Sequence, residues 1–140
     1  MFFTGISRYS DTIASTQAAA IKDNAAQLLE IKLLVDEAES ILCSQADISE
    51  FGRLLDHTWQ LKRGLADNIS SSYIDDIYQK AKTAGAIGGK LMGAGGGGFI
   101  VLFAQPDAQP RIRETLKDFV YVPFSFENEG SRIIHYAPEE

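Results

Sequence analysis

The sequence of 140 residues has one cysteine, Cys43, only four prolines, and no apolar run long enough to cross a bilayer, which takes about 20 residues. A single cysteine excludes an internal disulfide and cannot build a cysteine metal cluster. Met1–Gly5 offers no basic segment followed by a long apolar stretch, so it does not have the pattern of a signal peptide. We therefore expect a protein without a membrane-spanning segment, located in the cytoplasm.

Basic residues are also scarce, because 13 lysines and arginines face 19 aspartates and glutamates, for a net charge of −6. Proteins that bind nucleic acids or anionic membranes usually need a basic face, so neither is expected as a partner. A phosphate ligand remains compatible, because backbone N–H groups bind anions in acidic proteins too. The hydrophobic fraction of 45% is ordinary for a globular protein. A chain of this length can bury a core of its own, and we expect one domain over residues 1–140.

The first third of the sequence predicts a strand followed by a long helix. Met1–Thr4 is apolar and β-prone, and Gly5 ends it. Residues 12–44 lack proline, and their apolar positions recur at spacings of three and four, which is one face of a helix. About 30 residues is long for a globular helix, so a break near Asp23–Asn24 is expected. Cys43 is expected to be buried in this helix.

Two further helices precede the glycine-rich part of the sequence. Asp47–Glu50 resembles a capping box, with an acceptor at the cap and Glu three residues later. The apolar stripe behind it predicts a helix over residues 51–67. Ser70–Ser72 offers another cap, with Asp75 in the first turn, where the helix dipole favours a carboxylate. Gly85 is a suitable end for this helix.

The last third predicts mainly strands. Phe99–Phe103 is a continuous apolar run, which is typical of a strand buried on both faces. Asp107 is expected to cap a short helix. Tyr121–Phe126 alternates as a half-buried strand does, and its proline confines that strand to a sheet edge or a bulge. Residues 132–136 predict a final strand. The order β-α-α-α-β-α-β-β favours an α+β sandwich with helices packed on one face of a mostly antiparallel sheet.

The run Gly93–Gly98 directly precedes the strand that begins at Phe99. Flexible linkers join domains, whereas this run adjoins core segments on both sides, so a linker is disfavoured. The run can instead form a turn that needs positive φ or close backbone approach, or a loop whose amides bind an anion. Gly93, Gly95 and Gly98 match G-x-G-x-x-G, but the dinucleotide fingerprint has a strand before it and a helix after it. A P-loop would have lysine in place of Phe99.

Lys90–Gly98 (KLMGAGGGG) resembles the third, C-terminal motif of the GHMP small-molecule kinases, which include galactokinase, homoserine kinase and mevalonate kinase. Four more stretches are similar to the C-terminal half of the bacterial D-glycero-D-manno-heptose 7-phosphate kinases, at residues 3–8, 59–63, 84–90 and 122–134. The glycine motif alone indicates the superfamily. The whole set, which runs from residue 2 to residue 136, indicates the heptose kinase branch and its sugar-1-kinase relatives, such as fucokinase.

The resemblance implies a ferredoxin-like C-terminal domain and a parent enzyme that transfers the γ-phosphoryl of ATP, with Mg²⁺, to the anomeric hydroxyl of a heptose 7-phosphate. The product, a 1,7-bisphosphate, would serve nucleotide-heptose and surface polysaccharide synthesis. The family's nucleotide loop, P-x-x-x-G-L-G-S-S-A, does not occur in this sequence. We therefore expect no catalytic residue and no metal site in this chain, and an inactive fragment without the N-terminal domain.

The resemblance also places the glycine run in the cleft between the two domains, where it would border the nucleotide and the substrate. This loop consists of Gly93, Ala94, Gly95, Gly96, Gly97 and Gly98. A sugar phosphate needs cations, and arginine suits bidentate contact best. Five residues are candidates, although a single residue of this kind is more often a solvated surface charge: Arg8, Lys62, Arg63, Lys90 and Arg132. Trp59, beside Lys62 and Arg63 on one helical turn, is expected to belong to the core rather than to a sugar platform.

Two functions of other classes stay open at this point. A stand-alone module of this fold could sense a phosphorylated metabolite through the glycine loop, and fold alone does not decide between the two. The long helix could instead serve a structural dimerisation domain. An upstream domain in the natural reading frame would favour the kinase, whose partners are then ATP and a sugar phosphate. Apolar surface that faces the other domain would also favour homodimers of the isolated chain.

Overall fold

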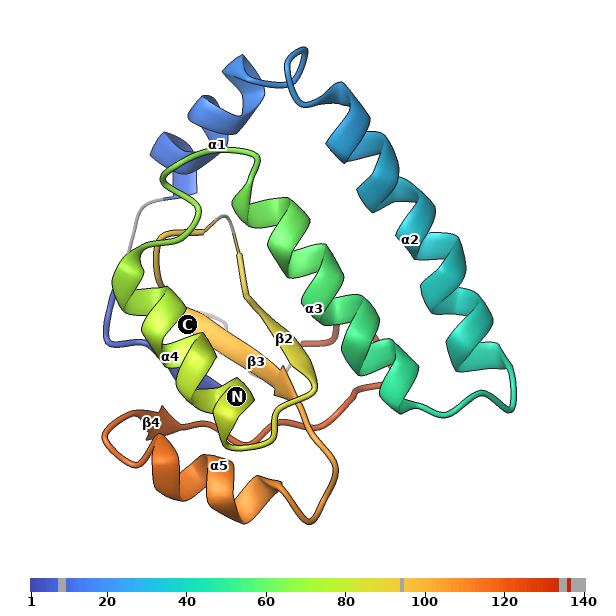
Figure 1. Cartoon of the computed structure of the whole chain (residues 1–140), viewed down its shortest axis with the longest axis vertical. Coiled ribbons are helices and arrows are strands. Elements are labelled where there is room, and N and C mark those ends of the chain that lie inside the picture. Colours follow the sequence, from blue (N-terminus) through green and yellow to red (C-terminus); the bar gives the residue numbers. More distant parts are fainter. Residues whose placement is uncertain (8–9, 94, 134–135, 137–140) are drawn as a thin grey trace.

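The computed structural model describes residues 1–7, 10–93, 95–133 and 136, without the side chains of residues 10–13. Figure 1 shows the arrangement of the helices and strands. In chain order the elements are β1 (Phe2–Phe3), α1 (Ser10–Ala19), α2 (Ala25–Cys43), α3 (Ser49–Arg63), α4 (Ser72–Thr83), β2 (Gly88–Leu91), β3 (Phe99–Phe103), α5 (Gln109–Thr115) and β4 (Val120–Tyr121). Within the described residues, no helix combines the length and the apolar character that a membrane span requires.

The four strands form one antiparallel sheet in the order β2-β3-β1-β4. Phe2 lies opposite Ile100, and Ile100 lies opposite Leu91, so these three side chains share one face, and all are buried. On the other face Phe3 contacts Phe99, with ring centroids 5.2 Å apart, and Phe99 is exposed. The core continues from the first face into α3, α4 and α5. The predicted α+β class, with helices gathered over one face of an antiparallel sheet, is therefore confirmed.

Helix α3 lies directly against β2, as Figure 1 shows. A Cβ atom on Gly88 would stand 1.9 Å from the carbonyl oxygen of Gly52, so the contact between helix and strand leaves no room for a side chain at Gly88. Helix α2 packs along the outer side of α3, where Glu30 Oε1 lies 3.0 Å from His57 Nε2. No residue of α2 is buried, and four of its large apolar side chains are exposed: Leu29, Leu33, Val35 and Leu42.

The expected break in the first long helix is confirmed, because α1 and α2 are separated by residues 20–24. Asn24 stands just before α2, and its side-chain Nδ2 donates to the carbonyl of Leu65 at 2.8 Å. The prediction that Cys43 is buried is wrong, because Cys43 lies exposed in the last turn of α2. Periodicity identified the helix but not how little of its surface the rest of the chain covers.

The two expected helix caps have different outcomes. Ser71 caps α4, since its Oγ accepts from the N–H of Ile74 at 3.4 Å. The capping box before α3 forms only in part. Asp47 Oδ1 accepts from the N–H of Ser49 at 2.9 Å, but the carboxylate of Glu50 pairs with Arg53 rather than reaching back to the cap.

Three strand predictions in the second half need correction. Strand β2 was not expected, because its glycine pair carries no strand signal. The strand Phe99–Phe103 is confirmed, but it is not buried on both faces, since only Ile100 in it is buried. The edge strand expected over Tyr121–Phe126 is confirmed only at its first residue, because β4 covers Val120–Tyr121 and residues 122–126 belong to no strand. Phe126 is 93% exposed.

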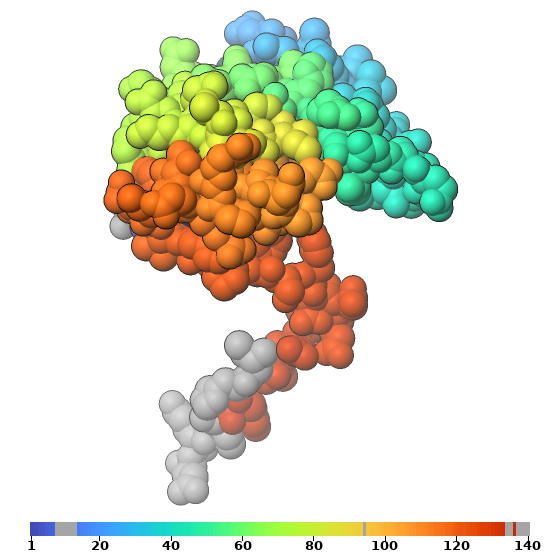
Figure 2. Space-filling model, turned by 60° about the horizontal axis from the view of Figure 1, so that its bottom comes forward, coloured from blue at the N-terminus to red at the C-terminus, as the bar shows by residue number. Residues whose placement is uncertain are grey.

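The remaining C-terminal predictions are also corrected. Helix α5 begins at Gln109 after Ala108, and no side chain caps it, so Asp107 does not have the expected role. Residues 132, 133 and 136 belong to no strand, and residues 134 and 135, also expected in the last strand, lie outside the described residues. Figure 2 shows the C-terminal segment extending away from the body of the molecule. A strand pattern needs a neighbouring strand to pair with, and this segment has none in the described part of the chain.

A charged hydrogen-bond cluster joins α3, α4 and β2. The hydroxyl of Tyr78 donates to Asp56 Oδ1 at 2.5 Å, and Lys82 Nζ lies 3.1 Å from Asp56 Oδ2. Lys82 also donates to the carbonyl of Ile87 at 2.7 Å. Burial and the hydrogen bond to Asp56 raise the pKa of Tyr78 above its usual value of 10.0. Partial burial of Asp56 works in the opposite direction, but hydrogen bonds from Tyr78 and Lys82 hold the pKa of Asp56 below its ordinary value.

The variant Tyr78→Phe is expected to lose about 1–2 kcal/mol of unfolding free energy at neutral pH, because a hydrogen bond to a charged group disappears. The folded-state pKa of Tyr78 is raised, so its contribution is fully present below pH 10 and is lost as the pH rises further. Urea unfolding near neutral pH and near pH 10.5 measures both effects, and the gap between the two proteins should narrow at the higher pH. Tyr73→Phe is the matched control, since the Tyr73 hydroxyl donates only to the neutral carbonyl of Thr4. An equal loss in both variants would contradict this account.

Candidate functional site

The glycine run forms a loop between β2 and β3, at the end of the sheet opposite α5 (Figure 1). Four hydrogen bonds fix it to distant parts of the chain. The carbonyl of Gly98 accepts from both the N–H and the hydroxyl of Thr4, each at 2.8 Å. The N–H of Gly98 donates to Ile6 at 2.7 Å, and the N–H of Gly96 donates to Ile69 at 2.9 Å. The loop is therefore held between the segment that follows β1 and the segment that precedes α4.

Two of the glycines allow this close approach of backbone to backbone. Gly95 has φ +128°, and a Cβ there would lie 2.9 Å from both Cα and the carbonyl oxygen of Ile69. A Cβ on Gly97 would lie 2.7 Å from Cγ2 of Ile6 and 2.8 Å from its carbonyl oxygen. The geometry favours the interpretation in which glycine serves a tight turn and close packing, and it contradicts a flexible linker.

The first part of the loop is different, because it is exposed. Gly93 has φ +90°, and apart from its chain neighbours no atom of the described residues would lie within 4 Å of a Cβ placed on it. Its carbonyl accepts a hydrogen bond from Lys62 Nζ at 2.8 Å. We call Met92 and Gly93 the loop edge. Ala94, the next residue of the predicted site, lies outside the described residues. The loop thus has a packed part, Gly95–Gly98, and an open edge beside a cation.

A second lysine lies near the loop edge. Lys90 is the third residue of β2, two positions before the loop, and lies opposite Val101 of β3. Burial, followed by the charge of Lys90, lowers the pKa of Lys62 from its usual 10.5. Among the described residues, no carboxylate forms an ion pair with either lysine. Lys62 therefore lies at the loop edge, the charge of Lys90 acts on it, and neither lysine has a carboxylate partner among the described residues.

The three arginines of the predicted site have other surroundings. Arg63 pairs with Asp75 at 2.5 Å and also donates to Gln60 at 3.0 Å. Arg132 lies in the C-terminal segment, where it pairs with Glu129 at 2.9 Å and with Glu127 at 3.8 Å. Arg8 lies outside the described residues. The structure thus brings two of the five predicted cations to the glycine loop, while Arg63 and Arg132 already have carboxylate partners.

Trp59 is a core residue, as expected, with 1% of its surface exposed and its ring centroid 6.4 Å from that of Tyr78. The residues that sequence reasoning missed are those that hold the loop in place. Thr4, Ile6 and Ile69 are far from the loop in sequence and of ordinary type. Thr4 and Ile6 lie in the family-like stretch at residues 3–8, but only the folded chain shows that they and Ile69 contact the glycines.

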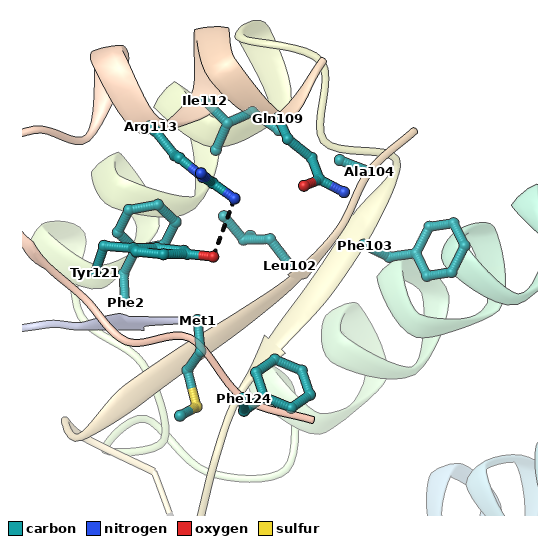
Figure 3. Close-up of a pocket in the computed structure, with 10 residues that line it drawn as sticks. All are labelled: Met1, Phe2, Leu102, Phe103, Ala104, Gln109, Ile112, Arg113, Tyr121 and Phe124. Atoms are coloured by element: carbon teal, nitrogen blue, oxygen red, sulfur yellow. Dashed lines mark hydrogen bonds between the residues drawn. The ribbon is translucent and has the colours of Figure 1, made fainter. Parts of the chain in front are cut away.

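A separate hollow of about 280 Å³ lies between the sheet and α5 (Figure 3). It is at the end of β3 opposite the glycine loop, and much of its lining is apolar, with Phe2, Ile112 and Phe124 among the lining side chains. Its one guanidinium, from Arg113, already stacks 4.5 Å from the ring centroid of Tyr121 and donates to the Tyr121 hydroxyl at 3.1 Å. This hollow therefore has a mixed polar and apolar lining, and we assign no ligand to it.

The described residues contain no cluster of three or more His, Cys, Asp or Glu side chains that could hold a metal ion. The residues described here consequently do not fit a Mg²⁺ site, and we assign them no step that passes through the metal. What the site can offer is a backbone loop fixed in position and two ammonium groups at its open edge.

Comparison with known proteins gives one family match, in which residues 34–122 match the model of the GHMP kinases C terminal. The D-glycero-alpha-D-manno-heptose 7-phosphate kinase of Campylobacter jejuni is 34% identical over 88 residues, which cover 61% of this chain and 26% of that protein. The mevalonate kinase of Pyrococcus horikoshii is 36% identical over 104 residues, which cover 71% of this chain and 31% of that protein.

A solved structure agrees with these sequence matches. The crystal structure of L. major mevalonate kinase in complex with R-mevalonate matches with a TM-score of 0.70 and 25% identity, over 84% of this chain and 36% of that chain. The present chain thus spans about a quarter to a third of the curated relatives and about a third of that structure.

Proposed function

This chain belongs to the GHMP kinase family, as a C-terminal domain, and from that premise we propose that its parent protein is an ATP-dependent sugar kinase. The proposed acceptor is the anomeric hydroxyl of D-glycero-D-manno-heptose 7-phosphate. The similarity to the Campylobacter jejuni heptose kinase supports this acceptor, together with the heptose-kinase-like stretches of the sequence. The similarity to mevalonate kinases supports the reaction type, which is phosphoryl transfer to an alcohol.

One observation carries the proposal, namely the open loop edge at Gly93 with Lys62 bonded to its carbonyl. In the proposed reaction the sugar oxygen forms a bond to the γ-phosphorus of ATP, the bond from that phosphorus to the ADP oxygen breaks, and the hydroxyl proton is lost. Catalysis of this kind depends mainly on positioning and on neutralising charge. The role that we assign to this chain is to hold the acceptor at a fixed backbone loop. The acid or base, the nucleotide loop and the Mg²⁺ ligands are assigned to the rest of the parent.

A fucokinase or another sugar-1-kinase is the alternative within the same reaction class. A sensor of phosphorylated metabolites is the alternative outside it, and it rests on the same loop edge. The exposed apolar side chains of α2 support a further proposal, that α2 meets the remainder of the parent or a second copy of this chain.

Calorimetric titration of MgATP tests the division of labour between the two parts of the parent. We expect no saturable heat from this 140-residue chain at millimolar nucleotide, and saturable binding to the full-length parent. A cooperative unfolding transition in the same sample of the chain is the control, because it shows that an absence of heat is not an absence of fold. Saturable binding of MgATP to the chain alone would contradict the assignment of the nucleotide to the rest of the parent.

A further inference from the structure

The loop edge holds two like charges in a place where nothing in the described chain neutralises them. The ammonium of Lys62 donates one hydrogen bond to the carbonyl of Gly93. An ammonium has three N–H donors, so two of them can bind another acceptor. The side chain of Lys90 forms no hydrogen bond or ion pair with the described residues. The positive charges of Lys62 and Lys90 repel each other, which costs free energy. An anion bound between them would be attracted to both charges and would offset that cost.

The space at the loop edge is open. Gly93 is exposed, and apart from its chain neighbours no described residue has an atom within 4 Å of the position of a Cβ on it. Lys90 is two residues after Gly88, so by the alternation of a strand its side chain leaves β2 on the side where Gly88 meets α3, the helix that carries Lys62. Both lysines are half-buried, which restricts their side chains more than those of fully exposed lysines. A tetrahedral oxyanion at the loop edge would therefore meet two partly ordered cations.

The other cations of the described chain near this end are already engaged. The guanidinium of Arg63 forms an ion pair with the carboxylate of Asp75. The hydroxyl of Ser70 donates to the same carboxylate at 2.6 Å. An incoming phosphate there would face the carboxylate of Asp75 as well as the arginine. The lysine pair is the better anion site of the two because it has no such competitor in the described chain.

We propose that Lys62 and Lys90, at the edge of the glycine loop, form a subsite for a phosphate monoester carried by the substrate. This inference rests on the proposed function only for the identity of the substrate, which is a phosphorylated sugar. The phosphate group bound here is not the one transferred from ATP. Its two ammonium contacts select acceptors that carry a dianion over acceptors that carry a carboxylate or no charge.

The first experiment uses the 140-residue chain labelled with ¹⁵N and titrated with inorganic phosphate at constant ionic strength. We expect saturable shifts of the Gly93 amide with a dissociation constant in the millimolar range. The double variant Lys62→Met and Lys90→Met should abolish these shifts. Lys22→Met with Lys80→Met is the matched control, because it removes the same charge from two exposed lysines elsewhere, and its shifts should equal those of the unsubstituted chain. Shifts that are absent, or that persist in the Lys62/Lys90 variant, would overturn the proposal.

The second experiment uses the full-length parent and separates the two sources of phosphate. Lys90→Met leaves the bond between Lys62 and Gly93 intact, so a disturbed loop does not explain its effect. We expect it to raise KM for the phosphorylated sugar about 10- to 100-fold, while KM for MgATP stays unchanged. An increase in KM for MgATP instead would overturn the assignment to the substrate. If the parent turns out to act on an acceptor without phosphate, the proposed function fails, but the titration of the chain still decides whether the lysine pair binds phosphate.

Discussion

Replacing Gly95 by alanine is expected to destabilise the chain by about 3 kcal/mol or more, which is a large fraction of the stability of a domain this size. Two costs add. A non-glycine residue at φ +128° carries backbone strain of about 1–3 kcal/mol. The new Cβ also lies 2.9 Å from backbone atoms of Ile69, which cannot rotate away as a side chain would, and overpacking of this kind costs about 1–3 kcal/mol.

Equilibrium unfolding in urea measures this loss, and Gly93→Ala is the matched control. Gly93 also has positive φ, at +90°, but a Cβ there meets nothing within 4 Å. We expect Gly93→Ala to lose only the strain, about 1 kcal/mol. Equal losses in the two variants would show that the packed part of the loop does not approach Ile69 as described. A large loss at Gly95 also means that reduced activity of a Gly95 variant reports folding and not ligand contact.

Elements whose sequence signals lie close together in the chain were predicted correctly, whereas elements that depend on distant contacts were not. The helices and the strand Phe99–Phe103 were predicted because their periodicity, Ser71 and the glycine ends lie within a few residues of each other. Strand β2 was missed because Gly88 and Gly89 are glycine for tertiary reasons and not for a turn: α3 approaches Gly88, and β3 approaches Gly89. The alternation of Tyr121–Phe126 is typical of a strand, but pairing stops after Val122, whose N–H donates to the carbonyl of Met1 at 2.8 Å, because the described chain supplies no strand opposite residues 123–126.

In the candidate site, too, the features with a local sequence signal were predicted and those that depend on distant contacts were not. The motif indicated the glycine loop, and composition indicated five cations without ranking them. The ranking needed tertiary contacts, because the partner of Arg63 is 12 residues away, and the contact of Lys62 with Gly93 spans 31 residues. The sequence also gave no sign that most of the loop is packed against Ile6 and Ile69 and that only its first residues are open.

The acceptor preference of the parent is expected to show the largest effect on activity. A site built around two ammonium groups leaves them unpaired when the acceptor lacks a dianion, and such mismatches lower kcat/KM by several powers of ten. We therefore expect kcat/KM for D-glycero-D-manno-heptose 7-phosphate to be about 10³-fold or more above kcat/KM for the same heptose without phosphate, for L-fucose and for R-mevalonate. The new phosphate should appear on the anomeric oxygen.

The most direct test of the account is this panel, measured with the full-length parent at saturating MgATP, with release of ADP followed in time and the products identified by ³¹P NMR. The account predicts rapid turnover of the heptose 7-phosphate to a 1,7-bisphosphate and little turnover of the other acceptors. A preference for L-fucose or R-mevalonate would contradict the proposed substrate. An absence of transfer to every acceptor, from a folded parent that binds MgATP, would contradict the proposed sugar kinase activity.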